Sequence, residues 1–286
     1  MLWLRKRAEA PARSAAEIVP AALPLALDSR LFAQHFAQLH ETVASQGGME
    51  PSLERLTAKQ RLFAVTLAGA REQEIDAEAL ARLLGYVFTA RRHLLPALDR
   101  LGSQHCTRLM RDLSDTRVAP VQRLQNFVDA MPGAQTPDRA DVRAAARLRR
   151  AAWDFAAEVV HYADPVRFPL MSRWVWDSST QSGALREFVR GNDTIRELPF
   201  DNSAELFEGA RQWLSGCIAE HGIYRDVPLW IDFVLGQAYT SYLRSMANGS
   251  LGGEFGRGAE PHEHLSKLLG VDAEEGRLRK SVMSDK

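Results

Sequence analysis

The sequence has little of what marks a specialised chemistry. It contains only two cysteines, Cys106 and Cys217, and each stands alone in a helical pattern, without the paired spacing of a zinc or redox site. We expect both to be buried thiols in a protein of the reducing cytoplasm. Lys+Arg and Asp+Glu both number 36, so the formal net charge is zero. The charge balance therefore gives no reason to expect nucleic acid or an anionic membrane as an obligatory partner.

Long apolar runs are lacking too. No segment approaches the roughly 18 uncharged apolar residues of a membrane span, so we expect no integral membrane association. The N-terminal stretch carries Glu9, Pro11 and Glu17 where a secretory signal needs an unbroken apolar run. Both absences favour a cytoplasmic location.

Strand patterns are absent as well, whereas helical spacing is abundant. No polar and apolar alternation ends in a hairpin turn, and no repeat of about 20 to 50 residues recurs. Apolar residues instead recur every three or four positions, which predicts an all-α, irregular multi-helix globular fold of roughly ten helices with no sheet. Asp28 or Ser29, Asp76 and Asp138 stand where they can cap helices. Further helices are predicted at about 103–114, 118–131, 183–190, 203–221, 226–247 and 261–269.

Three more helices are predicted from capping and proline signals. Residues 57–60 resemble a capping box that begins a buried helix. A helix from 76 to 102 has Pro96 as a kink or a fresh start. Pro165 is expected to open a short helix that runs to Trp174.

The loop MPGAQTPD is the best candidate for an internal boundary, because its proline, glycine and polar residues interrupt the helical pattern. One continuous core is the alternative. The expected division is a flexible N-terminal tail, an N-terminal helical lobe, a C-terminal helical lobe and a charged C-terminal tail, at residues 1–27, 28–133, 134–270 and 271–286.

Charge is uneven along the chain. Residues 82–150 hold thirteen arginines against six aspartates, whereas residues 197–264 hold four arginines against ten acidic residues. Two such regions can dock onto each other or steer a charged partner.

The densest segment chemically is 161–190, which lies between two helical patterns. It mixes histidine, arginine, tryptophan and proline, and its large apolar side chains predict a shaped, largely buried connection. The candidate binding residues are all in this segment: His161, Arg167, Arg173, Trp174, Trp176, Asp177 and Arg186. The structural alternative is that the arginines form ion pairs and the tryptophans fill the core.

Three functions are considered. The leading hypothesis is a cytoplasmic accessory or adaptor protein that binds a protein partner through segment 161–190, with self-association open. The alternative is an all-α enzyme or small-ligand binder, with Arg167 or Arg173 holding an anionic group, His161 as acid or base and Asp177 orienting it. The third is nucleic-acid binding by the basic stripe within 139–150, which zero net charge disfavours.

Signals for catalysis and for metals are weak. Glu158-x-x-His161 is half of a di-iron pattern, but no second Glu-x-x-His occurs, so we expect no metal and no cofactor. His161 is expected to cap carbonyls at its helix end and to pack against Trp174. No serine nucleophile motif is present and no catalytic residue is assigned, which leans against an enzyme and leaves the enzyme alternative open.

Overall fold

The computed structural model describes residues 17–249 and 260–272. Within these ranges the chain forms ten α-helices and one short 3-10 helix, without a strand, so the predicted all-α fold is confirmed. The helices are α1 (Ser29–Ala44), α2 (Met49–Glu72), α3 (Ala77–Gly85), α4 (Arg91–Leu101), α5 (Ser103–Leu113), α6 (Pro120–Asp129), α7 (Arg139–Ala163), η1 (Ala184–Phe188), α8 (Ala204–Glu220), α9 (Val227–Gly249) and α10 (Pro261–Leu269).

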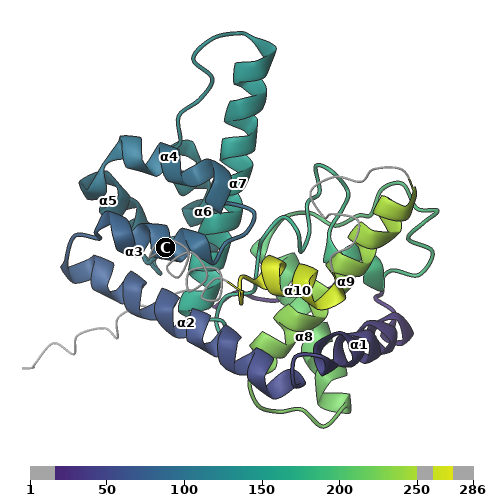
Figure 1. The fold of residues 1–286 in the computed structure, drawn as a ribbon. Coiled ribbons are helices and arrows are strands. Elements are labelled where there is room, and N and C mark those ends of the chain that lie inside the picture. Colours follow the sequence, from purple (N-terminus) through teal and green to yellow (C-terminus); the bar gives the residue numbers. More distant parts are fainter. Residues whose placement is uncertain (1–16, 250–259, 273–286) are drawn as a thin grey trace, which may run out of the picture.

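The helices gather in two groups (Figure 1). Helices α2 to α7 lie on one side, where α7 packs against α2, α4, α5 and α6. On the other side α9 packs against α1, α8 and η1, and α10 lies on α9. The start of α7 projects beyond its neighbours at the top of the view.

Polar caps begin several of the helices as the sequence predicts. The Asp28 carboxylate accepts the backbone N–H of Arg30, and Asp138 accepts that of Ala140. Asp76 caps α3 in the same way. These side chains satisfy backbone donors that the first helical turn leaves without partners.

Two predicted helices have different bounds. Helix α2 begins at Met49, so residues 57–60 lie in its interior and are not its cap. The predicted helix 76–102 is two helices, which are separated by turns at residues 86–90. The break lets the Tyr86 carbonyl approach the end of α10, where Gly270 has φ +71°. A Cβ on Gly270 would lie 1.8 Å from that oxygen, so this contact requires glycine.

The short helix predicted from Pro165 to Trp174 is wrong. Residues 164–183 form turns and extended backbone, packed by buried side chains. Pro165 and Pro169 both lack an N–H donor, and each disfavours helical geometry at the residue before it. The expectation of a shaped, buried connection agrees with what is found.

A continuous core joins the two groups of helices. Buried apolar side chains from both sides of the predicted boundary at 133/134 belong to one cluster. Helix α1, from the predicted N-terminal lobe, packs on α9, whereas α7, from the predicted C-terminal lobe, packs on α2. The division into lobes at 133/134 stays a prediction, and helix packing crosses it.

A buried ion pair lies where α2, α7 and α10 meet. The Lys59 ammonium is fully buried and donates to Glu158 Oε2 and to the Leu269 carbonyl, both at 2.7 Å. It also lies 4.2 Å from the ring centroid of Tyr162. Burial raises the pKa of Glu158, and the nearby ammonium opposes that shift.

The two predicted tails extend beyond the residues that the structure describes. The predicted tails lie partly or wholly in residues 1–16 and 273–286, which are outside the described ranges. None of the described helices combines the length and the apolar character needed to cross a membrane.

We expect Lys59→Met to destabilise the protein by about 3 to 5 kcal/mol at pH 8, because it leaves a buried carboxylate without a counter-charge. Without the ammonium, the pKa of Glu158 in the folded protein stays above its ordinary value of 4.5. The loss should therefore shrink as pH falls towards 5 and the carboxyl takes up a proton. Urea denaturation at several pH values measures this.

The double variant Lys59→Met with Glu158→Leu is the control. It removes both charges, so most of the lost stability should return at pH 8. A double variant no more stable than Lys59→Met would show that packing, and not charge, accounts for the loss.

Candidate functional site

A cavity of about 610 Å³ lies between the two groups of helices. The turn before α4, the first turn of α4, the middle of α7 and the connection between α7 and η1 line it, together with Tyr239 of α9 and Leu268 of α10. Its volume is within the range of small-molecule sites, and such sites are frequent where two packed units meet.

Arginines dominate the polar lining. Five arginines and His93 line the cavity, against two aspartates, Asp154 and Asp177. The arginines come from three separate segments: Arg91 and Arg92 from α4, Arg147 and Arg150 from α7, and Arg173 from the connection.

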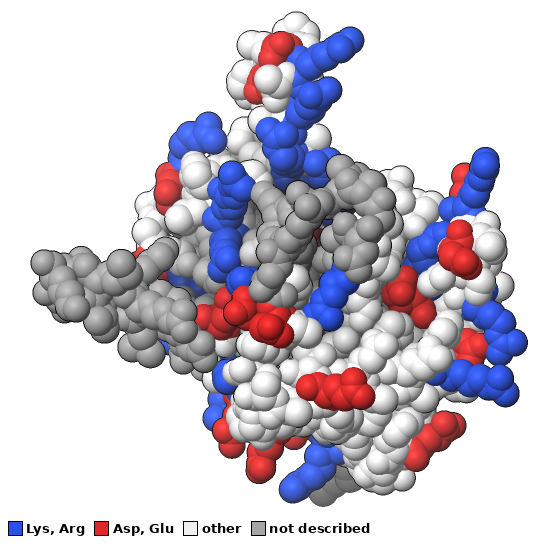
Figure 2. Space-filling view, turned by 45° about the vertical axis from the view of Figure 1, so that its right-hand side comes forward, with Lys and Arg blue, Asp and Glu red and all other residues white. Residues whose placement is uncertain are grey.

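Two of these arginines, Arg147 and Arg150, are exposed, and within the described part of the chain neither forms an ion pair. They continue a row of basic residues on α7 that begins with Arg139 and Arg143. Figure 2 shows Lys and Arg side chains along the upper projection, which is the start of α7. The row predicted as a nucleic-acid stripe therefore runs along an exposed helix into the cavity.

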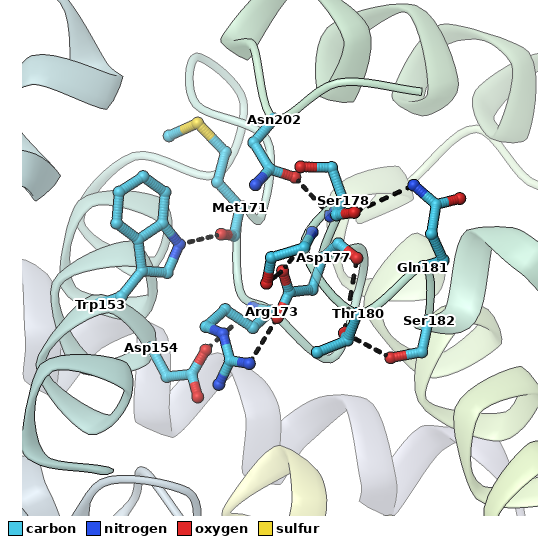
Figure 3. A network of polar contacts seen from close by, with 11 residues as sticks. Trp153, Asp154, Met171, Arg173, Asp177, Ser178, Thr180, Gln181, Ser182 and Asn202 are labelled. Atoms are coloured by element: carbon cyan, nitrogen blue, oxygen red, sulfur yellow. Dashed lines mark hydrogen bonds and ion pairs between the residues drawn. The ribbon is translucent and has the colours of Figure 1, made fainter. Parts of the chain in front are cut away.

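A polar network holds one wall of the cavity (Figure 3). The backbone N–H of Arg173 donates to Asp154 Oδ1 at 2.9 Å, and its guanidinium pairs with Asp177. The Asp177 carboxylate also accepts the N–H and the hydroxyl of Ser179, at 3.0 and 2.6 Å. Arg173 thus links the Asp154 carboxylate of α7 to the turn that contains Asp177.

The two aspartates have opposite electrostatic behaviour. Burial raises the pKa of Asp154 to about 6, more than the Arg173 contacts lower it. Burial also opposes ionisation of Asp177, but hydrogen bonds from Ser179 and Arg173 outweigh it and lower its pKa. Asp154 can therefore exchange a proton near neutral pH, whereas Asp177 stays ionised.

Aromatic side chains line another part of the cavity. Trp174 is 3% exposed, and its ring centroid lies 6.0 Å from that of Tyr239. The Trp174 indole Nε1 is buried and has no hydrogen-bond partner among the described residues. Such a buried donor is uncommon in folded proteins.

Of the predicted binding residues, Arg173, Trp174 and Asp177 line the cavity together. Trp176 does not line it; it is 1% exposed, and its Nε1 donates to the Phe200 carbonyl. The structural interpretation, that both tryptophans fill the core, agrees with their burial.

Arg167 and Arg186 also lie outside the cavity lining. The Arg167 guanidinium stacks 5.2 Å from the Phe168 ring centroid. Arg186 donates to the carbonyls of Asn192 and Ile195, and so fixes the loop after η1. Its role in the structure is to satisfy backbone acceptors.

The contacts of His161 differ from those predicted. Its Nδ1 lies 2.8 Å from the Phe168 carbonyl, which belongs to the following connection and not to its own helix. Its Nε2 lies 3.0 Å from Asp232 Oδ2, and the ring contacts Tyr162. Since both nitrogens are occupied and His161 does not line the cavity, the proposed acid–base role together with Arg173 and Asp177 is not supported.

The Glu158-x-x-His161 pattern also resolves into separate contacts. Glu158 binds Lys59, whereas His161 binds Asp232. No group of three or more His, Cys, Asp or Glu side chains in the described ranges could hold a metal ion.

Sequence reasoning missed Asp154 and the pair Arg91 and Arg92. One signal for Asp154 was present: it lies four residues before Glu158, in an otherwise apolar stretch of α7. A carboxylate on the buried face of a helix needs a partner or a function. The α4 arginines carried no comparable signal, because the predicted helix 76–102 places them in its interior, where an exposed arginine needs no partner.

The chain was compared with family models, curated proteins and solved structures. Nothing matched. The function is therefore inferred from the chemistry of the cavity.

We expect Asp154→Asn to change how stability depends on pH. The carboxyl of Asp154 has an ordinary pKa of 3.8 and a folded value of about 6, so the folded state binds its proton more tightly. Its contribution to stability is full below pH 4 and is lost as pH rises through 6. Between pH 4 and pH 8 the free energy of unfolding of the variant, relative to that of wild type, should therefore rise by about 3 kcal/mol. Urea denaturation of the ligand-free protein measures this difference.

Asp177→Asn is the matched control. Because the pKa of Asp177 is lowered, its stabilisation is present above the ordinary pKa and is lost on acidification, so this variant should lose relative stability as pH rises. If both variants changed in the same direction, the assignment of opposite environments would be wrong.

Proposed function

We propose that this protein binds a small phosphate-bearing anion in the arginine-lined cavity. One observation carries the proposal: five arginines from three segments converge on a single cavity that holds only two aspartates. Guanidinium groups repel one another, and a bound anion removes that repulsion. The planar guanidinium fork also matches the geometry of phosphate oxygens.

The pairing of the arginines supports an anion from outside the chain. Arg173 is neutralised by Asp177, but Arg147 and Arg150 have no carboxylate partner among the described residues. Even with Asp154 and Asp177 both ionised, the five arginines outnumber the two carboxylates of the lining. The cavity is therefore cationic near neutral pH.

This proposal develops the small-ligand alternative of the sequence analysis. The adaptor hypothesis places a protein partner on the aromatic and arginine side chains of segment 161–190, and an anchor of this kind needs one of its tryptophans at the surface. Trp174 and Trp176 are both buried. A protein partner and self-association stay predictions. We keep a cytoplasmic location as part of the proposal, because Cys106 and Cys217 are buried free thiols.

Inorganic pyrophosphate tests the proposal. We expect isothermal titration calorimetry to detect binding by the full chain, and Arg147→Gln with Arg150→Gln to weaken it at least tenfold. Each substitution removes a charge-assisted contact worth roughly 1.5 to 3 kcal/mol. Both side chains are exposed, so the fold should be unaffected.

Arg139→Gln with Arg143→Gln is the matched control. It removes the same charge from the same helix at exposed positions outside the cavity lining. Unchanged affinity in this control, with a tenfold loss in the cavity variant, supports the proposal. Equal losses would show diffuse attraction to the α7 stripe, and no binding by wild type would overturn the proposal.

A further inference from the structure

The residues that line the cavity are of two kinds, exposed and buried. Arg91, Arg147 and Arg150 are exposed, whereas Ala151, Asp154, Trp174 and Leu268 are buried. Positive charge thus gathers where the cavity meets solvent, and the Asp154 carboxyl lies deeper, among aromatic and apolar side chains. A ligand that fills such a site has an anionic end and an uncharged end.

The deeper part suits a flat ring. Trp174 and Tyr239 present aromatic surface at an interplanar angle of 44°, and Phe88 also lines the cavity. Aromatic side chains stack favourably on the faces of heterocyclic bases. Inorganic phosphate would fill only a small part of the 610 Å³.

The same part offers one donor and one acceptor for the edge of a ring. The buried Trp174 Nε1 donates and has no partner in the described ranges. The Asp154 carboxylate accepts through Oδ1 from the Arg173 backbone and interacts with the Thr89 side chain, which also lines the cavity. A carboxylate has further lone pairs that can accept from a ring N–H. Nucleobases present C=O or ring-nitrogen acceptors beside N–H donors along one edge. A plain phenyl ring would offer no acceptor to the Trp174 N–H and no donor to Asp154.

We propose that the ligand is a nucleoside phosphate, with its phosphate at the exposed arginines and its base against the cavity wall formed by Trp174, Tyr239 and Asp154. This inference rests on the proposed function, since it names the ligand class of the same cavity. The base edge accepts from Trp174 and donates to Asp154. The phosphate supplies Arg147 and Arg150 with the counter-charge that no carboxylate in residues 17–249 and 260–272 supplies.

The first experiment compares ligands that differ only by the base. Binding of the 5′-monophosphates of adenosine, guanosine, cytidine and uridine is measured by calorimetry beside ribose 5-phosphate. We expect at least one nucleotide to bind ten times more tightly than ribose 5-phosphate. If ribose 5-phosphate binds as tightly as all four, the inference is overturned, while arginine-dependent pyrophosphate binding keeps the proposed function. If no phosphate compound binds, pyrophosphate included, both fail.

The second experiment removes the indole N–H and keeps an aromatic ring. Trp174→Phe should weaken the preferred nucleotide about tenfold and leave pyrophosphate affinity unchanged. Trp153→Phe is the control, because the Trp153 Nε1 donates to the Met171 carbonyl at 2.9 Å and Trp153 does not line the cavity. The control should keep both affinities. Equal nucleotide affinity in wild type and Trp174→Phe, with the variant folded by circular dichroism, would overturn the role of Trp174.

Discussion

The buried contact between Lys59 and Glu158 is the constraint around which the helices are arranged. A fully buried ammonium is expensive unless charge and hydrogen bonds compensate it, and here one carboxylate and the Leu269 carbonyl do so. The three groups belong to α2, α7 and α10. None of these helices can rotate or slide without exposing a buried charge to apolar surroundings, so the pair fixes their relative positions.

Helix α7 carries this constraint to the cavity. Asp154, Glu158 and His161 follow at spacings of four and three, which places them on one face of the helix. Their partners come from different elements, namely the Arg173 backbone, Lys59 and Asp232. The face that holds the core together therefore also places Asp154 on the cavity wall, with Arg150 four residues earlier at the exposed end.

Local patterns in the sequence predicted the parts of the structure that depend on local physics. Helical spacing and the caps at Asp28, Asp76 and Asp138 were sufficient for the fold class, and the mixed composition of 161–190 identified the connection that bears Arg173. The sequence could not pair Lys59 with Glu158, because 99 residues separate them. For the same reason it could not bring α4 and α7 arginines together, or turn His161 away from Asp177.

Three unfavourable features meet in the cavity, and one ligand class relieves all three. The arginines repel one another, the burial of Asp154 disfavours its ionised form, and the Trp174 donor has no acceptor among the residues that the structure describes. At the two buried positions, Asp154 and Trp174, packing alone would favour side chains without an unpaired polar group, since burying such groups destabilises a fold. In the proposed complex a phosphate balances the arginines, and the edge of a base accepts a hydrogen bond from the indole N–H and donates one to the carboxylate. Because these needs differ in charge and in geometry, a plain anion would balance only the arginines, and an apolar ring would meet none of the three needs.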